Sequence, residues 1–232
     1  MTATRHVLAM GGEDWSTPGG SGLDHYLLGL SDRARPRVLL VPTATGDAGG
    51  TIAGFYRAFP SSRCEPSHLS LYRRDRAPLE ELVAAADIVF VTGGSTVNLL
   101  SVWRAHGLDT VLRAAAERGV VLAGFSAGAL CWFEGGITDS FGPQLSGLKD
   151  GLGMVKGSFC PHYRNQSRRR SRYLELVADG FPEGIGADDL VGLHFVDGVL
   201  HQVVAGRDGA GAVRVRRQDE GAVEEPLDVV RS

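Results

Sequence analysis

The residues best suited to covalent chemistry form a G-x-S-x-G sequence at 124–128, with Ser126 at its centre. An apolar run at 120–125 leads directly into Ser126, and small residues that can begin a helix follow it. In such a strand–turn–helix a serine hydroxyl stands clear of the sheet edge, and flanking glycines avoid Cβ clashes in the tight turn. The bare pattern is weak in a chain with 32 glycines, so this context carries the prediction that Ser126 is a nucleophile.

A serine nucleophile needs a base to take its proton. Cys160-Pro161-His162-Tyr163 places a histidine in a constrained loop downstream, and we predict His162 as that base. The other six histidines lie on expected helices, strands or element ends: His6, His25, His68, His106, His194 and His201. We interpret those six as structural.

A second glycine turn, Thr92-Gly93-Gly94-Ser95-Thr96, follows another apolar run. In a parallel sheet this turn would lie at the same carboxyl edge as Ser126, where α/β folds place their sites. A backbone N–H of Gly93 or Gly94 could then stabilise an oxyanion, together with one from the helix start after Ser126. A phosphate-binding turn, or a merely tight one, is the alternative.

The elements that position these residues alternate between apolar runs and helical patterns, which indicates βαβ units around a parallel sheet. Strands are predicted at 6–10, 37–41, 64–72, 87–94 and 120–125, and helices at 50–59, 77–86, 96–105 and 109–118. The glycine-rich stretch 135–157 predicts loops or a hairpin over the sheet, and 167–180 a basic amphipathic helix. Short antiparallel strands are predicted at 190–195, 199–204 and 211–215.

These patterns predict one α/β domain over residues 1–232. It consists of a central, mostly parallel sheet with helices on both faces and a short antiparallel C-terminal extension.

Composition excludes several classes of function. A net charge of −3 gives no basic field for nucleic acid, and no apolar stretch approaches the ~18 residues of a membrane span. The N-terminal apolar run is too short for a signal peptide, so we expect a cytoplasmic protein. Cys64, Cys131 and Cys160 form neither a disulfide framework nor a metal clip. We expect no metal and no cofactor.

Together, AGFSAGA at 123–129, VTGGST at 91–96 and Pro-His after a glycine-rich loop resemble peptidase E, the aspartyl dipeptidase family related to cyanophycinases. The resemblance runs from the first strand to Leu193. It implies a flavodoxin-like fold, similar to that of class I glutamine amidotransferases, with serine in place of cysteine. It further implies Ser126 as nucleophile, His162 as general base, and the Gly94 and Ala127 amides as oxyanion hole.

The third member of the family's triad is a glutamate in a Gly-x-x-Glu segment, and here that segment reads Gly186-Ala187-Asp188-Asp189. The resemblance therefore implies Asp189, a departure that shortens the acid by one methylene. Either acid can orient the histidine ring. Asp139 is the alternative third acid, and Glu134 is a further rival.

The densest positive charge follows His162 and comprises five arginines: Arg164, Arg168, Arg169, Arg170 and Arg172. A guanidinium can hold a carboxylate through two parallel hydrogen bonds. By position Arg169 matches the family's arginine, so we predict that Arg169 and Ser95 contact the substrate. A solvated helix face is the alternative.

We therefore predict a serine peptidase that hydrolyses small peptides, in particular dipeptides with an N-terminal aspartate, through an acyl-enzyme. The protein would be a monomer or homodimer. Two alternatives stay open: a cyanophycinase-like hydrolase of β-aspartyl-arginine units, and a non-catalytic binding relative. Cys131 lies about one and a half helical turns beyond Ser126 and cannot replace it. Loops at 13–22 and 141–157 are expected to shape the substrate pocket.

Overall fold

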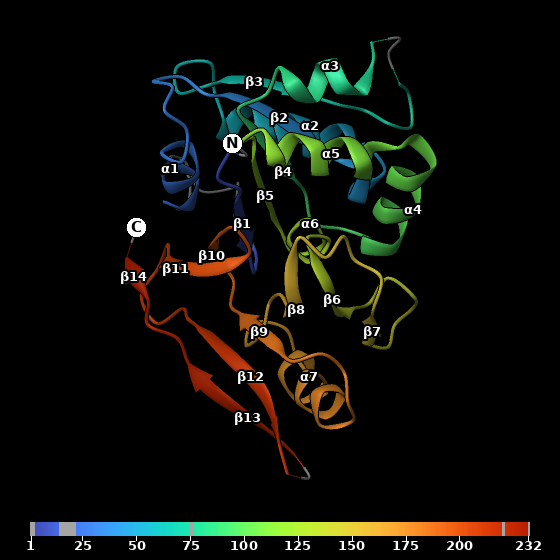
Figure 1. The fold of residues 1–232 in the computed structure, drawn as a ribbon, viewed down its shortest axis with the longest axis vertical. Helices are drawn as coiled ribbons and strands as arrows, with labels where there is room; N and C mark the ends of the chain where they lie inside the picture. Colours follow the sequence, from blue (N-terminus) through green and yellow to red (C-terminus); the bar gives the residue numbers. More distant parts are fainter. Residues whose placement is uncertain (1–2, 14–21, 75–76, 220, 232) are drawn as a thin grey trace.

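The computed structural model describes residues 3–13, 22–74, 77–219 and 221–231. Its larger sheet has eight strands: β1 (His6–Met10), β2 (Arg37–Val41), β3 (Glu65–His68), β4 (Ile88–Val91), β5 (Val121–Phe125), β10 (Val191–Val196), β11 (Val199–Ala205) and β14 (Val230–Arg231). They lie in the order β14-β11-β10-β1-β5-β4-β2-β3 (Figure 1). β1 to β5 are parallel, whereas β10 runs antiparallel to β1 and β11 antiparallel to β10. The carboxyl ends of β1, β4 and β5 therefore meet at one edge.

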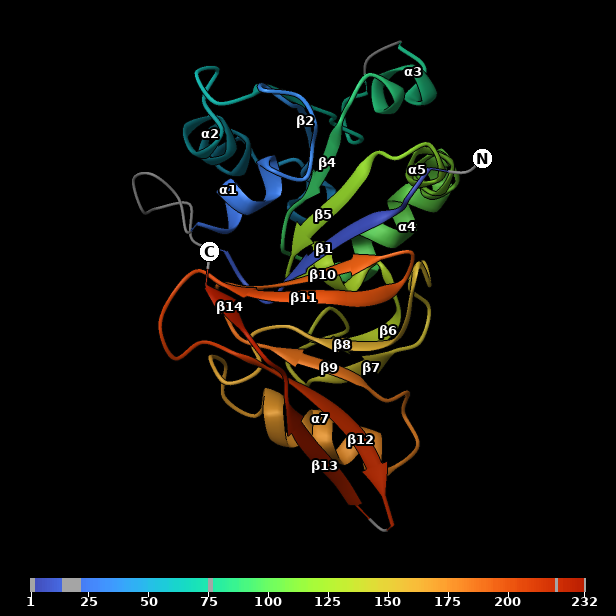
Figure 2. The same cartoon turned by 60° about the vertical axis from the view of Figure 1, so that its left-hand side comes forward.

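Helices cover both faces of this sheet (Figure 2). In chain order they are α1 (Leu23–Leu28), the 3-10 turn η1 (Thr43–Thr45), α2 (Gly49–Ala58), α3 (Leu79–Ala84), α4 (Thr96–His106) and α5 (Leu108–Glu117). Side chains alternate along β1, so that Leu8 packs with α1 and α2 whereas Val7 packs with α3, α4 and α5. This alternation explains why the parallel strands read as continuous apolar runs.

A second sheet carries the rest of the chain. Its strands are β6 (Phe133–Thr138), β7 (Ser146–Leu148), β8 (Val155–Cys160), β9 (Gly184–Ala187), β12 (Ala212–Gln218) and β13 (Gly221–Pro226), in the order β13-β12-β9-β8-β6-β7. Short α6 (Ala127–Leu130) links β5 to β6, and α7 (Arg169–Ala178) packs through Tyr173 and Val177 against Val215 of β12. Phe133, Phe159 and other residues of the second sheet join the core cluster beneath α4 and α5.

The predicted α/β class, with a mostly parallel sheet and helices on both faces, is confirmed, and three details differ. The strand predicted at 64–72 is only the short β3. The stretch 135–157 holds a hairpin, as one alternative had it, but also the start of β8. The C-terminal strands do not form one extension, because β10 and β11 complete the large sheet while β12 and β13 join the second.

Two further expectations concern the membrane and the pocket loops. Among the described residues, no helix combines the length and apolar character needed to cross a membrane. Of the loop at 13–22, residues 14–21 lie outside the described residues.

Candidate active site

Ser126 stands at the tip of β5, between the strand and α6, with φ 54° and ψ −117°. A non-glycine residue at positive φ is strained, and such strain persists where the surrounding structure enforces it. The flanking glycines explain how this turn fits. A Cβ at Gly124 would lie 2.7 Å from the Val91 carbonyl oxygen, and one at Gly128 would lie 2.7 Å from that of Thr92. Glycine is therefore required on both sides of Ser126.

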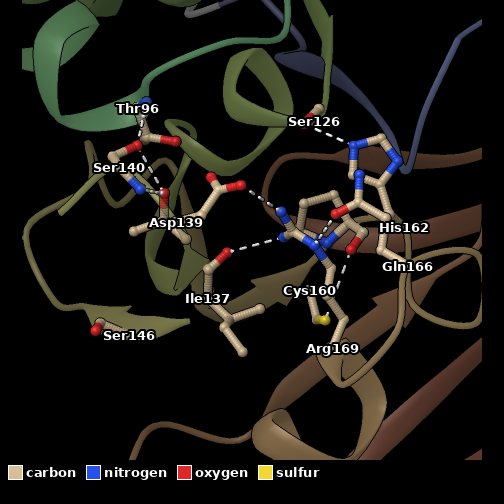
Figure 3. A network of polar contacts seen from close by, with 12 residues as sticks. Thr96, Ser126, Ile137, Asp139, Ser140, Ser146, Cys160, His162, Gln166 and Arg169 are labelled. Atoms are coloured by element: carbon tan, nitrogen blue, oxygen red, sulfur yellow. Dashed lines mark hydrogen bonds and ion pairs between the residues drawn. The ribbon is translucent and has the colours of Figure 1, made fainter. Parts of the chain in front are cut away.

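His162 follows β8 and also adopts positive φ, at 55°. Its Nε2 lies 2.8 Å from Ser126 Oγ, and its Nδ1 lies 2.5 Å from Asp189 Oδ1. Figure 3 shows the ring of His162 turned toward Ser126. Because a carboxylate only accepts hydrogen bonds, Nδ1 donates to Asp189 and Nε2 is left to accept from the serine hydroxyl. The predicted trio thus lies in one hydrogen-bonded line.

Asp189 lies in the short connection between β9 and β10, on the opposite side of β1 from Ser126. Two strand spacings, roughly 10 Å, separate these flanking strands, and an imidazole with a hydrogen bond at each end can span that gap. The Asp189 amide donates to Asn165 Oδ1 at 2.7 Å. The side chain of neighbouring Asp188 is buried and accepts from Arg164 Nε at 2.8 Å and from the Gly211 amide at 3.0 Å. These contacts fix the loop that presents the acid.

The two rival acids have other partners. The Asp139 carboxylate is 59% exposed and lies 3.7 Å from Arg169 Nη2, while Glu134 accepts from the Gly157 amide at 2.8 Å. His162 Nδ1 is hydrogen-bonded to Asp189. The geometry therefore favours Asp189 over both rivals as the histidine's partner.

The Gly93–Gly94 turn lies against the serine, since a Cβ at Gly93 would come within 3.2 Å of Ser126 Cβ. Gly94 is exposed and has φ 137°, which favours glycine. The Ser95 amide donates to Ala44 and the Ser126 amide to Met10. These two amides are committed to the backbone, so the neighbouring amides of Gly94 and Ala127 are the candidates for an oxyanion hole.

The predicted substrate contact Ser95 caps α4, where its Oγ accepts from the Asn98 amide at 3.3 Å. Next to it, the Thr96 amide donates to Ser140 Oγ at 2.9 Å, and Ser140 is bonded in turn to Thr138 Oγ1 at 2.8 Å. This network, visible in Figure 3, fastens the segment that carries Asp139 to the glycine turn.

The five arginines differ in their partners, and three of them line a groove. Arg164, Arg170 and Arg172 form ion pairs with Asp188, Glu224 and Glu175, respectively. Arg169, the first residue of α7, is 4% exposed and donates to Gln166 Oε1 at 2.6 Å. A groove of about 1190 Å³ opens here, lined among others by Asp139, Gln144, Ser146, Arg168, Arg169 and Arg172.

Comparison with known proteins places these features in a family. The model of Peptidase family S51 matches residues 7–203. The chain belongs to this family. The S51 chain is 46% identical over 227 residues to the uncharacterized peptidase YgaJ of Bacillus subtilis (strain 168), covering 97% of this chain and 98% of that one. It is a serine-type peptidase by membership of the family.

Two solved structures share the fold of this S51 peptidase. A peptidase from an acI-B1 actinobacterium superposes with a TM-score of 0.69 at 19% identity, covering 97% of this chain and 94% of that one. A candidate peptidase E protein from Listeria monocytogenes EGD-e superposes with a TM-score of 0.61 at 16% identity, covering 97% of this chain and all of that one.

Cys131 of the S51 chain, the cysteine that follows Ser126, is fully buried, and its Sγ donates to the Gly128 carbonyl at 3.3 Å. Burial raises the pKa of this thiol well above its usual value, so it is held as the neutral thiol. Cys131 is therefore a buried small side chain, in agreement with the expectation that it does not replace Ser126.

Sequence reasoning missed three residues that shape the site: Gly12, Asn165 and Asp188. A Gly-Gly pair directly after the first strand falls at the same sheet edge as Ser126, and this position was the available signal for Gly12. Asn165 contacts the loop that carries Asp189, and Asp188 anchors this loop to Arg164 and Gly211. Both contacts depend on long-range pairing, which no local sequence pattern reveals.

Proposed function

We propose that this S51 peptidase hydrolyses small peptides with an acidic N-terminal residue, using Ser126, His162 and Asp189 as a catalytic triad. The observation that carries the proposal is the unbroken hydrogen-bonded line from Ser126 Oγ through His162 to Asp189. Such a line supplies what a serine lacks by itself, namely a base in reach and an acid that orients that base.

In the proposed reaction His162 Nε2 takes the hydroxyl proton while Ser126 Oγ attacks the peptide carbonyl carbon. The Gly94 and Ala127 amides donate to the resulting oxyanion. The imidazolium, stabilised by Asp189, then gives its proton to the leaving amine as the C–N bond breaks, which leaves an acyl ester on Ser126. Water, deprotonated by His162, hydrolyses the ester and restores the serine.

The preference for an acidic residue is supported by the groove around Arg169, whose lining includes Gln166, a residue whose amide donates to the His162 carbonyl. Arg169 and exposed Arg168 line it, and the ion pair of Arg169 with Asp139 is long, at 3.7 Å. A substrate carboxylate placed in the groove would compete with Asp139 for the Arg169 guanidinium and could hold it by two hydrogen bonds. A small acidic peptide is the ligand class that best fits this charge pattern.

The test is a screen of Asp-X, Glu-X, β-Asp-X and neutral dipeptides with the wild type and with Ser126→Ala. We expect hydrolysis of Asp-X by the wild type and a loss of about 10⁴-fold or more in kcat for Ser126→Ala, since the nucleophile is removed. Ser31→Ala, at a serine remote from the site, is the matched control and should keep full activity.

Two outcomes would count against the proposal. A folded Ser126→Ala protein with wild-type turnover would exclude Ser126 as nucleophile. Turnover of β-Asp-X alone would leave the triad standing and replace the proposed substrate with a cyanophycinase-like one.

A further inference from the structure

Gly12 lies next to the contact between Asp189 and His162, and a side chain at this position would push the proposed acid away from the proposed base. We infer that Gly12 is a positioning residue, whose missing Cβ allows the Asp189 carboxylate to reach His162 Nδ1. This inference rests on the proposed triad.

The segment 10–12 continues β1 between the nucleophile and the acid. On one side the Ser126 amide donates to the Met10 carbonyl at 3.0 Å. On the other side the Leu190 amide donates to the Gly12 carbonyl at 3.0 Å, and Gly12 forms a parallel bridge with Asp189. A single stretch of backbone therefore sets the position of Ser126 and of Asp189 together.

At Gly12 the limit is space and not backbone conformation. Gly12 is buried and is not in the left-handed region, so its φ does not itself demand glycine. A Cβ built on it would lie 2.8 Å from Asp189 Cγ, 3.0 Å from His162 Nδ1 and closer still to Asp189 Oδ1. Every one of these three neighbours is an atom of the proposed acid or base.

Neighbouring Gly11 has a different role. A Cβ there would lie 2.6 Å from the Ala187 carbonyl oxygen and 2.8 Å from the Asp188 carbonyl carbon, both backbone atoms. Backbone cannot rotate away as a side chain can, so Gly11 serves the packing of β1 against the β9–β10 connection. Gly11 is therefore required by the packing of the fold, whereas Gly12 is required by the geometry of the site.

The experiment is a double-variant cycle with Gly12→Ala, Asp189→Ala and both together, measured by kcat/KM on the best dipeptide of the screen. Gly12→Ala alone should lower kcat/KM by about 10²-fold or more, approaching the effect of Asp189→Ala, because both leave the ring without its carboxylate. In the Asp189→Ala background the same change should cost less than about threefold, since the clash with the carboxylate has gone. Gly50→Ala, on a helix with open space around it, is the control.

A second readout needs no turnover. The hydrogen-bonded Nδ1 proton of His162 should give a low-field proton resonance in the wild type and in Gly50→Ala, and lose it in Gly12→Ala and in Asp189→Ala. Failure of all peptide substrates would refute the proposed function while leaving this spectroscopic test intact.

Three results would overturn the inference: wild-type activity in Gly12→Ala, equal losses from Gly12→Ala in both backgrounds, or a retained resonance in Gly12→Ala. If Gly12→Ala fails to fold, the double variant decides. A folded double variant locates the clash at Asp189, whereas an unfolded one shows that Gly12 serves packing in general and ends the proposal.

Discussion

At the scale of single residues, Arg169 carries a buried charge that its surroundings compensate only loosely. Its guanidinium donates to the Gln166 side chain and, at 3.4 Å, to the Ile137 carbonyl, and its carboxylate partner Asp139 is 3.7 Å away. A buried cation gains most from a close, desolvated carboxylate. We therefore expect a carboxylate arriving with the substrate to improve on the contact that Asp139 makes.

Asp139→Asn tests this competition. Removing the resident carboxylate should strengthen binding of acidic dipeptides, lowering their KM by about two- to fivefold, the range expected for an exposed charge pair. The KM of neutral dipeptides and kcat for all substrates should change little. Steady-state kinetics on matched acidic and neutral dipeptides measures the difference.

Arg169→Ala in the Asp139→Asn background is the control, and it should abolish the gain for acidic substrates. A loss of 10²-fold or more in kcat on every substrate with Asp139→Asn would contradict the assignment. It would mean that Asp139, the alternative third acid, serves His162.

At the scale of elements, the site depends on the connection between β9 and β10. Asp188 and Asp189 are adjacent, yet one is buried under Arg164 and Gly211 while the other contacts His162. Successive residues of an extended chain point in opposite directions, so one aspartate can anchor the loop while the next faces the site.

Asp188→Ala should destabilise the protein by about 1–3 kcal/mol, because it removes the buried carboxylate that accepts from the Arg164 guanidinium and the Gly211 amide. It should also lower kcat/KM, since the loop that positions Asp189 loses its anchor. Urea unfolding and dipeptide kinetics measure the two effects. Asp208→Ala, which removes an exposed pair with Arg231, is the matched control and should stay within about 0.5 kcal/mol of the wild type. Equal stability of the two variants would contradict the anchoring role.

Most apolar strands could be predicted nearly to the residue, although β4 spans only Ile88–Val91 of the predicted 87–94. β5 begins one residue later than expected and β1 matches its prediction. β6 could be predicted only through the hairpin alternative for 135–157, because Gly135 and Gly136 weaken its strand pattern. The structure gives the reason for those glycines, since a Cβ at Gly136 would lie 2.7 Å from Leu130 Cγ of α6. Close packing against α6 requires glycine in β6, and these glycines remove the alternating apolar pattern by which a strand is recognised in the sequence.

At the scale of the molecule, the site forms where two sheets meet. Ser126 comes from the first sheet, His162 follows a strand of the second, and Asp189 lies between β9 of the second and β10 of the first. Local motifs could identify these residues as candidates. Their proximity depends on pairing between segments more than one hundred residues apart, as between Gly12 and Asp189. Because the two sheets share one core cluster, we propose that residues 1–232 unfold as one domain.

His194 allows this whole-molecule stability to be tested through pH. It is buried on β10, with Nε2 2.9 Å from His6 Nδ1 and Nδ1 2.9 Å from the Tyr26 hydroxyl, and His201 packs at its edge. Burial first, and then the neighbouring charges of His6 and His201, lower the pKa of His194 to about 4 from its usual 6.5. Between these two pKa values His194 is neutral in the folded protein and protonated in the unfolded chain.

This difference in proton binding determines how the free energy of unfolding changes with pH. The stability that neutral His194 contributes is fully present above about pH 6.5, and it declines as the pH falls toward about 4, because only the unfolded state gains the proton. Between about pH 7 and pH 5 the free energy of unfolding should fall by about 1–2 kcal/mol on this account. The lowered pKa values of Asp87 and Glu224 place the titration of these two carboxylates below this pH range.

Urea unfolding followed by tryptophan fluorescence and by circular dichroism should give one coincident transition at each pH, since Trp103 and Trp132 lie in the shared core. Its midpoint should fall between pH 7 and pH 5 in the wild type and fall less in His194→Gln, which keeps polar contacts without a titrating ring. Two separate transitions would contradict the single domain. Equal pH dependence in the wild type and His194→Gln would show that His194 is not the group whose protonation unfolds the chain.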